Sequence, residues 1–472
     1  MPEANERTSS RDAIFQPLLE TWKQYVQQAN ETTRQTLEQV GIDADPLAWR
    51  RGWFDALSHQ TDEFFRSPTF LGMLKRHVDS VIDALQRSRP VEGGGTSTDR
   101  LDGLEQEMSV RIDQIERDLE RIEKKIGRES RPEFASSSSA EQFEASKEAR
   151  GASPYEVVDR CGTMRLLRYK NRSVRFVEPV LICYALVNRP YILDLQSERS
   201  VVRKLCDAGF DVYLIDWGVP RDADRNLKLE DYVCRLMKRA GERALTLSGA
   251  ERLHLLGYCM GGTMSTMFTA LFPERVRNLV LMAAPIDFSG DDGLLNLWAR
   301  DEYFDVDRLV ETCGNCPGEF LKYCFQLMKP VQNFGEKYAH LCDHLEDDAF
   351  LRNFLAMEQW TNDSIPVAGE TFREFVKEYY QRNGLVRGEI ALGGAPIRLA
   401  AIECPVLLLV AEKDHLVPPR STLALERLTG SVDVRSLVIN SGHVGLAVSS
   451  KAHRELWPQV MTWMAERSTN TR

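Results

Sequence analysis

The sequence of 472 residues lacks a basic excess, a membrane-length apolar run and a regular cysteine framework. Lys and Arg number 60 against 70 Asp and Glu, so the formal net charge is −10 and the chain has no overall positive charge for binding nucleic-acid phosphates. The first ten residues lack the apolar stretch of a signal peptide, and apolar runs elsewhere end well short of the ~20 residues of a membrane span. We therefore expect a cytoplasmic protein with no nucleic-acid partner and no transmembrane segment.

Cysteine and histidine are both sparse, with 10 and 8 residues respectively. Cysteines without regular spacing in a long chain indicate reduced thiols. Cys313 and Cys316 form a C-x-x-C motif that no second pair accompanies, and His340 and His344 stand four residues apart without a familiar zinc pattern around them. The sequence therefore predicts no metal site, and it identifies no cofactor-binding residues.

Changes in composition divide the chain into regions. Residues 1–87 are helical in pattern, with scattered aromatic residues and no strand-like alternation. Residues 88–100 contain three consecutive glycines, and residues 128–154 contain a run of four serines, so both are predicted to be flexible linkers. From residue 155 to residue 472, short apolar runs alternate with helical segments.

Residues 101–127, between the two linkers, are charged and carry a heptad pattern. Apolar residues recur at alternating spacings of four and three: Met108, Ile112, Ile115, Leu119, Ile122 and Ile126. This pattern predicts a coiled coil, and Ile at both seam positions favours more than two strands and hence a homo-oligomer. An amphipathic helix that packs on its own domain would show the same pattern. The polar linkers leave no nearby core for such a helix to cover, which favours the coiled coil.

The region 155–472 has the alternation typical of an α/β sheet. Several apolar runs are each long enough for one buried parallel strand and too short for a helix: Val180–Leu186, Val212–Ile215, Leu253–Leu256, Val280–Ala283 and Val406–Val410. Residues 290–394 break this rhythm, because they are rich in aromatic, acidic and helix-forming residues and show no convincing strand. We predict that they form a helical cap inserted into the sheet domain.

The most specific motif is Gly257-Tyr258-Cys259-Met260-Gly261-Gly262, between an apolar run and a helix-forming segment. It is the pattern of a nucleophile elbow, in which small residues relieve crowding on a tight strand-to-helix turn. Cys259 stands where serine is usual. The helix N-terminus would favour its thiolate, and the backbone N–H of Met260 would point at a developing oxyanion. By itself the motif also fits a buried cysteine in a glycine-rich turn.

A thiol nucleophile needs a base, and the base needs a group that orients it. His443 lies in a glycine-flanked loop after the apolar Ser436–Ile439, and Asp414 follows the predicted strand Val406–Val410. The order Cys259, Asp414, His443 is that of nucleophile, acid and histidine in the α/β-hydrolase fold, so we predict this fold with a Cys-His-Asp triad. A base that also deprotonates a substrate hydroxyl should have a pKa near neutral.

Further residues are predicted near the triad with less specific signals. The second oxyanion donor would be the backbone N–H of Val187 or Asn188, in the loop after the first predicted parallel strand. Asp216 ends another strand, where it would orient the substrate or the elbow, or cap a loop as a buried acid. We interpret His254 as a core residue and expect His415 to point away from the triad.

Several blocks together resemble the catalytic subunit of class III polyhydroxyalkanoate synthases over about residues 155–467. They are Cys183–Pro190, Val212–Gly218, the Cys259 elbow, Ala411–Pro419 and Gly442–Gly445. The resemblance implies that Cys259 carries the acyl chain as a thioester, that His443 is the general base and that Asp414 supports activation of the incoming hydroxyl. The implied substrates are short-chain (R)-3-hydroxyacyl-CoA thioesters, and the implied product is a growing polyester at a granule surface. Coenzyme A would leave, and no other cofactor is implied.

Synthases of this class work with a separate accessory subunit. Residues 1–150 are similar to it in a general way, since they are helical, contain tryptophan and end in a charged helix. The chain would then be a fusion of accessory and catalytic parts. Otherwise the N-terminal region is an oligomerisation arm, and a separate accessory subunit is a possible partner.

Two other functions stay open at the level of sequence. An esterase, thioesterase or polymer depolymerase would use the same triad with water as the acceptor, although Cys259 and the block Asn188-Arg189-Pro190 favour the synthase. A non-catalytic granule-associated scaffold could be built on the coiled coil. Such a scaffold has no need of Cys, Asp and His in this order.

Overall fold

The computed structural model describes residues 46–87 and 151–471, apart from residues 152, 172, 291, 292 and 346. The predicted linker 88–100, the coiled coil predicted at 101–127 and most of the linker predicted at 128–154 lie outside the described residues, as do residues 1–45. The described residues up to Asp83 and from residue 151 onward belong to one unit of the chain.

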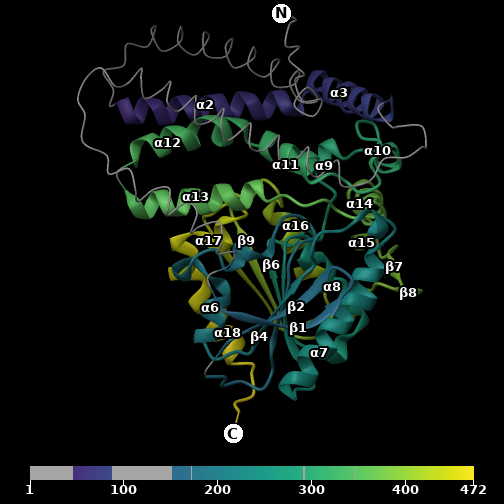
Figure 1. Cartoon of the computed structure of the whole chain (residues 1–472), viewed down its shortest axis with the longest axis vertical. Helices are drawn as coiled ribbons and strands as arrows, with labels where there is room; N and C mark the ends of the chain where they lie inside the picture. The colour runs from purple at the N-terminus through teal and green to yellow at the C-terminus, as the bar shows by residue number, and fades with distance from the viewer. Residues whose placement is uncertain are drawn as a thin grey trace, which may run out of the picture. The chain divides into compact units, whose positions relative to one another are not determined.

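A mixed eight-stranded sheet forms the centre of this unit (Figure 1). In spatial order the strands are β1 (Tyr155–Cys161), β2 (Met164–Tyr169), β4 (Val212–Asp216), β3 (Val180–Cys183), β5 (Leu253–Tyr258), β6 (Val276–Met282), β9 (Val406–Ala411) and β10 (Val434–Ile439). Neighbouring strands from β4 to β10 pair in parallel, whereas β2 pairs antiparallel with both β1 and β4. Each parallel run predicted from the sequence contains or overlaps one of these strands.

Helices cover both faces of the sheet, which is why its central strands are continuously apolar. The helices that flank the sheet or follow its strands are α6 (Val201–Asp207), α7 (Lys238–Ser248), α8 (Met260–Leu271), α16 (Pro419–Leu423), α17 (Gly445–Val448) and α18 (Trp457–Ala465). In Figure 1, α6 and α18 lie on one side of the sheet and α7 and α8 on the other. Every residue of β3, β5 and β9 is buried.

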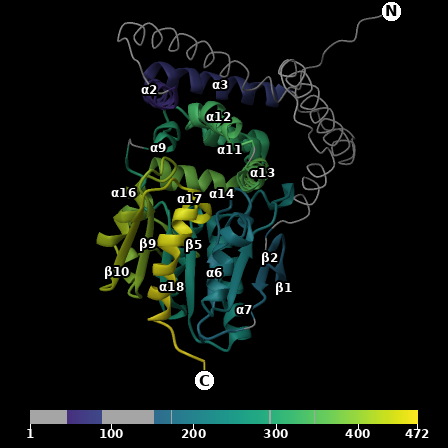
Figure 2. The same cartoon turned by 90° about the vertical axis from the view of Figure 1, so that its left-hand side faces the viewer.

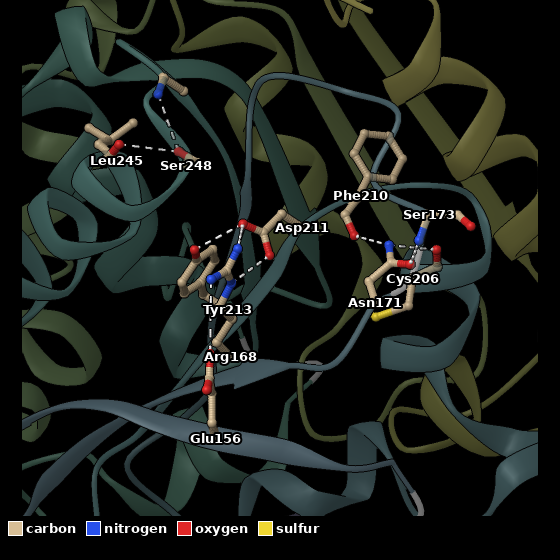
Figure 3. A network of polar contacts seen from close by, with 11 residues as sticks. Glu156, Arg168, Asn171, Ser173, Cys206, Phe210, Asp211, Tyr213, Leu245 and Ser248 are labelled. Atoms are coloured by element: carbon tan, nitrogen blue, oxygen red, sulfur yellow. Dashed lines mark hydrogen bonds and ion pairs between the residues drawn. The ribbon is translucent and has the colours of Figure 1, made fainter. Parts of the chain in front are cut away.

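A charged network attaches the antiparallel strand β2 to the parallel part of the sheet (Figure 3). The Arg168 guanidinium of β2 donates two hydrogen bonds of 3.0 Å to the buried carboxylate of Asp211, which precedes β4. The Tyr213 hydroxyl of β4 donates to the same carboxylate at 2.9 Å. This bidentate pairing fixes where β2 meets β4.

Between β6 and β9 the chain forms the predicted helical cap, which lies over the carboxyl ends of the parallel strands (Figures 1 and 2). Its helices are α9 (Leu294–Trp298), α10 (Val306–Cys313), α11 (Gly318–Leu327), η6 (Gln332–Glu336), α12 (Lys337–Asp343), α13 (Asp348–Asn362), α14 (Gly369–Glu374), η7 (Phe375–Gln381) and α15 (Gly384–Arg387). A short hairpin of β7 (Ala391–Leu392) and β8 (Ala395–Pro396) follows them, which the sequence did not indicate.

Two N-terminal helices, α2 (Pro46–Arg66) and α3 (Pro68–Arg87), pack on this cap. Phe65, Phe70 and Leu71 are buried in one apolar cluster with Trp298 and other cap residues. No helix in the part of the chain that the structure describes combines the length and the apolar character needed to cross a bilayer.

His254 is fully buried on β5, as the sequence analysis expected. Its Nε2 lies 2.9 Å from the Ser468 hydroxyl, and its Nδ1 lies 3.0 Å from the Asn278 amide nitrogen. Burial disfavours the charged imidazolium and lowers the pKa of His254 to about 4.

We predict that His254 makes the fold less stable in mild acid. Its pKa is about 4 in the folded chain and about 6.5 in an unfolded one, so the unfolded state binds the extra proton between these values. The stabilisation is complete above the unfolded pKa and is lost as the pH falls toward the folded one. Urea unfolding should show that His254→Asn reduces the loss of unfolding free energy between pH 7 and pH 5 by about 2 kcal/mol. His59→Asn, at an exposed side chain, is the control and should leave that loss unchanged.

Candidate active site

Cys259 occupies the turn between β5 and α8, in a backbone conformation that side chains rarely adopt. Its φ is 55° and its ψ is −130°. Two backbone hydrogen bonds hold it there: the Cys259 N–H donates to the Met282 carbonyl at 3.0 Å, and the Gly262 N–H donates to the Cys259 carbonyl at 2.7 Å. Strain of this kind persists only where the surroundings enforce it, and it is frequent at functional sites.

The glycines of the motif permit this turn because nothing larger fits. A Cβ on Gly261 would lie 2.2 Å from the Cys183 carbonyl oxygen of β3, and one on Gly262 would lie 2.3 Å from the Ala284 Cβ. A Cβ on Gly257 would lie 2.5 Å from the Ser265 hydroxyl. The sequence pattern of the elbow thus has a direct steric cause.

We predict that Gly261→Ala displaces the elbow. The added methyl meets backbone of β3, which cannot yield as a flexible side chain would, so we expect a loss of about 1–3 kcal/mol of unfolding free energy and slower alkylation of Cys259 by iodoacetamide. Gly52→Ala is the matched control, because its Cβ would meet nothing within 4 Å. Unfolding curves and alkylation rates that are unchanged in Gly261→Ala would contradict this account.

The structure brings the three predicted triad residues together. His443 Nδ1 lies 2.7 Å from Asp414 Oδ2, and the two side chains are only 11% and 1% exposed. The other carboxylate oxygen of Asp414 accepts the backbone N–H groups of Leu416 at 2.9 Å and Val417 at 2.8 Å. The acid is therefore held at both oxygens, with one of them on the imidazole.

Charge at the site favours the protonated form of His443. Burial lowers the pKa of His443, but the negative charges of Asp414 and Cys259, together with hydrogen bonds to both side chains, raise it by more. The net pKa lies above the ordinary value of 6.5, not near neutral as the sequence analysis expected. The difference arises because Cys259, when ionised, stabilises the imidazolium of His443.

Aromatic side chains that the sequence analysis did not assign to the site hold the imidazole in place. The Tyr258 ring stacks on His443 with centroids 5.2 Å apart, and the Tyr258 hydroxyl donates to the His443 carbonyl at 3.2 Å. The Tyr184 ring meets Tyr258 edge-on at 5.6 Å, and the Trp217 indole N–H donates to the Tyr184 carbonyl at 2.9 Å. In the sequence, only the position of Tyr258 directly before Cys259 could have indicated that Tyr258 lies at the site.

The cap packs on the helix that follows Cys259. Tyr380 of η7 packs on Phe288 with ring centroids 4.9 Å apart. Burial and, to a smaller extent, the charge of Cys259 raise the pKa of Tyr380. The adjacent Tyr379 hydroxyl donates to the Met267 sulfur of α8 at 2.9 Å. The cap is thus bound to the helix that begins at the elbow.

The residues predicted to form the oxyanion site are Met260, Val187 and Asn188, and they lie in different local environments. Met260 is the first residue of α8, so its N–H has no intrahelical acceptor and lies at the positive end of the helix. Asn188 has a φ of 63°, and the Val187 side chain packs into a cluster of cap and α3 residues. The loop after β3 is attached to the cap through Arg189, whose guanidinium lies 3.2 Å from the Asp363 carboxylate.

Asp216 has a structural environment. Its carboxylate accepts the Arg165 Nε at 3.0 Å and the backbone N–H of Gly218 at 3.0 Å. It is 6% exposed. These interactions match the buried acid that caps a loop, one of the two roles considered from the sequence.

The remaining histidine and cysteine candidates, His340, His344, Cys313 and Cys316, all belong to the cap. His340 and His344 have ring centroids 4.2 Å apart on α12 and its C-terminal end. The described residues include no group of three or more His, Cys, Asp or Glu side chains that could hold a metal ion.

We predict that Asp414→Asn slows the alkylation of Cys259 at pH 7 by about 10-fold or more. Removing this charge takes away one of the groups that raise the pKa of His443, so less imidazolium is present to stabilise a thiolate. The rate should be followed at Cys259 by peptide mass spectrometry from pH 5 to pH 10. Asp159→Asn, at a carboxylate of the edge strand β1 that pairs with Arg239, is the control. Identical pH profiles for Asp414→Asn and the unaltered chain would rule out this coupling.

Comparison with known proteins agrees with this fold. Residues 178–448 match the alpha/beta hydrolase fold family, and residues 109–205 match the Poly-beta-hydroxybutyrate polymerase (PhaC) N-terminus. The family match to 178–448 confirms the predicted α/β-hydrolase fold.

Curated relatives carry the name poly(3-hydroxyalkanoate) polymerase subunit PhaC. The protein of Haloferax mediterranei is 47% identical over 319 residues, which are 67% of this chain and 65% of the relative. That of Allochromatium vinosum is 46% identical over 289 residues, 61% of this chain and 81% of the relative. That of Synechocystis sp. is 45% identical over 296 residues, 61% of this chain and 78% of the relative. The chain spans just under two thirds of the Haloferax protein and more of the other two, and it belongs to the PhaC family of poly(3-hydroxyalkanoate) polymerase subunits.

Proposed function

We propose that this chain polymerises short-chain (R)-3-hydroxyacyl groups from coenzyme A thioesters into a polyester, with Cys259 as the nucleophile. The observation that carries the proposal is a cysteine at a strained elbow beside a His443–Asp414 pair, in a chain of the PhaC family. Cys259, His443 and Asp414 form the catalytic triad in this scheme.

In the first step Cys259 takes the acyl group from coenzyme A. His443 accepts the thiol proton, and the thiolate attacks the thioester carbonyl carbon. The tetrahedral oxyanion is stabilised by the Met260 N–H, with Val187 or Asn188 as the second backbone donor. The bond to the coenzyme A sulfur breaks, His443 returns the proton to that sulfur, and a Cys259 thioester remains.

In the second step a hydroxyl group attacks this thioester. Acylation removes the thiolate charge that raises the pKa of His443, so burial and Asp414 alone then set that pKa, at a lower value. More of the imidazole is then neutral, and the neutral form takes the proton of the 3-hydroxyl. The hydroxyl oxygen forms an ester bond with the acyl carbon, the carbon–sulfur bond breaks, and Cys259 leaves as the thiolate beside the His443 imidazolium. Conversion of a thioester into an ester supplies the drive for elongation, and coenzyme A is only the leaving group, so the scheme needs no further cofactor.

Water must be excluded from the acyl-enzyme, because hydrolysis would end the chain. The low exposure of His443 and Asp414 and the contact of the cap with α8 support a covered site. In this proposal the cap opens to admit the monomer and to release the polymer.

The partners of the chain follow from this chemistry and from the family. We infer that the polyester product forms a granule in the cytoplasm and that the chain works at its surface. Residues 1–150 would serve as the accessory part, and the heptad pattern at 101–127 would assemble a homo-oligomer.

The polymerase activity is tested with purified full-length chain and (R)-3-hydroxybutyryl-CoA. Chromatography of free coenzyme A and of polymer should show both products, and Cys259→Ala should lower both rates by about 10³-fold or more. Glu358→Gln, on the cap, is the matched control and should retain both. Release of coenzyme A with soluble hydroxy acid alone would identify a thioesterase. No release at all would contradict a polymerase that needs no separate subunit.

A further inference from the structure

We infer that helices α2 and α3 position the acid of the triad, because the apolar cluster that they form with the cap holds Leu416, whose backbone N–H in turn holds Asp414. Leu416 is thus a positioning residue that acts through Asp414 and His443. The inference rests on the role of Asp414 in the proposed function.

The first link is the dependence of Asp414 on the backbone that follows it. One carboxylate oxygen accepts the N–H groups of Leu416 and Val417, and the other lies 2.7 Å from His443 Nδ1. A rotation of the carboxylate toward His443 or away from it therefore requires the backbone at 416 and 417 to move.

The second link is the side chain of Leu416, which packs against a cluster built by N-terminal and cap helices. The buried members of this cluster are Phe65, Phe70, Leu71, Leu294, Leu297, Trp298 and Met328. Phe65 and Phe70 lie 6.1 Å and 6.0 Å from the Trp298 ring, and the Trp298 indole N–H donates to the Phe65 carbonyl at 3.4 Å. Leu416 is the member that comes from the triad loop.

Charged groups near His415 support the same placement of α2. Burial lowers the pKa of His415, Lys329 of the cap and Arg66 of α2 lower it further, and Asp414 and Asp62 of α2 oppose them. The Arg66 guanidinium and the Asp62 carboxylate are themselves paired at 2.7 Å. The end of α2 therefore faces the residue between Asp414 and Leu416.

Helix α3 also reaches the loop after β3. Val78 and Ile82 of α3 are buried in a second cluster with Leu309 and Leu321 of the cap, and the Val187 side chain packs against it. Each loop at the elbow thus sends one apolar side chain into a cluster that α3 helps to build. This arrangement is what a positioning element requires.

Polar contacts at the rim are weaker candidates for this role. The Lys75 ammonium donates to the Glu302 carbonyl at 2.8 Å, and Arg308 of α10 pairs with Asp79 at 3.4 Å and with Asp83. Exposed and half-exposed pairs of this kind contribute little to docking. The apolar clusters therefore supply the part of the contact that fixes the loops.

The test is Leu416→Ala in the full chain, which keeps the backbone N–H and removes the anchor. We expect kcat to fall about 10-fold or more with KM within about twofold, because a small misplacement of a triad group costs rate without weakening substrate binding. The pH profile of Cys259 alkylation should shift in the direction seen for Asp414→Asn. Phe65→Ala, on α2, should reproduce both effects, and the double variant should be no worse than the more severe single variant, since both act through one contact.

Lys75→Ala is the matched control, because it removes a contact of α3 with the cap outside the cluster. It should leave kcat and the alkylation profile unchanged. Leu416→Ala and Phe65→Ala could instead lower the unfolding temperature and leave the pH profile of Cys259 alkylation the same as in the unaltered chain. The helices would then contribute to stability only, and the inference would be overturned. If Asp414→Asn also leaves that profile unchanged, the triad itself is wrong. Because alkylation needs no substrate, these outcomes are distinct from a failure to make polymer.

Discussion

The structure depends on a backbone contact between the start of α8 and the end of β3. Gly261 lies so close to the Cys183 carbonyl and to Tyr184 that a single methyl group would clash with both. This contact fixes where the helix begins, and the helix start in turn imposes the positive φ of Cys259. The constraint is steric. The close packing around the turn permits no other backbone conformation at Cys259, and the stability of that packing offsets the strain energy of its positive φ.

Electrostatics then determine what the positioned thiol does. Asp414 is held by two backbone N–H groups on one oxygen and by the imidazole on the other, so its charge is directed at His443 and is not dispersed in solvent. The pKa of His443 responds to the state of Cys259 as well as to Asp414. In the proposed function, the same imidazole stabilises the thiolate before acylation and acts as a base after it.

The sequence predicted those elements of the fold that are determined by short stretches of neighbouring residues. The parallel strands are covered on both faces, so Leu253–Leu256 and Val406–Val410 were visible as apolar runs. The elbow was visible because its glycines are sterically required. The hairpin of β1 and β2 was not visible in the sequence. The residues of β1 are all exposed or half-buried and include charged side chains, so β1 does not form an apolar run.

Contacts between distant segments left no such signal. Asp216 follows a strand at the site edge, and only the structure shows that Arg165 occupies its carboxylate. The stacking of Tyr258 on His443 joins residues 185 positions apart, as does its hydrogen bond. The pKa of His443 was misjudged for the same reason, because it depends on a charge that comes near only in the folded chain. Sequence order predicted that Cys259, Asp414 and His443 act together, but the groups that surround His443 had to be seen in three dimensions.

The position of α2 and α3 gives a physical meaning to the resemblance between the N-terminal region and an accessory subunit. On the inferred role of α2 and α3, this helix pair must stay bound through its apolar clusters to keep the loops at Asp414 and Val187 in place. On a separate chain, its occupancy would fall with dilution. Tethering converts the same contact into an intramolecular one, whose effective concentration does not depend on the amount of protein. In the proposed scheme, fusion therefore keeps the triad ordered at protein concentrations where a dissociable subunit would leave it loose.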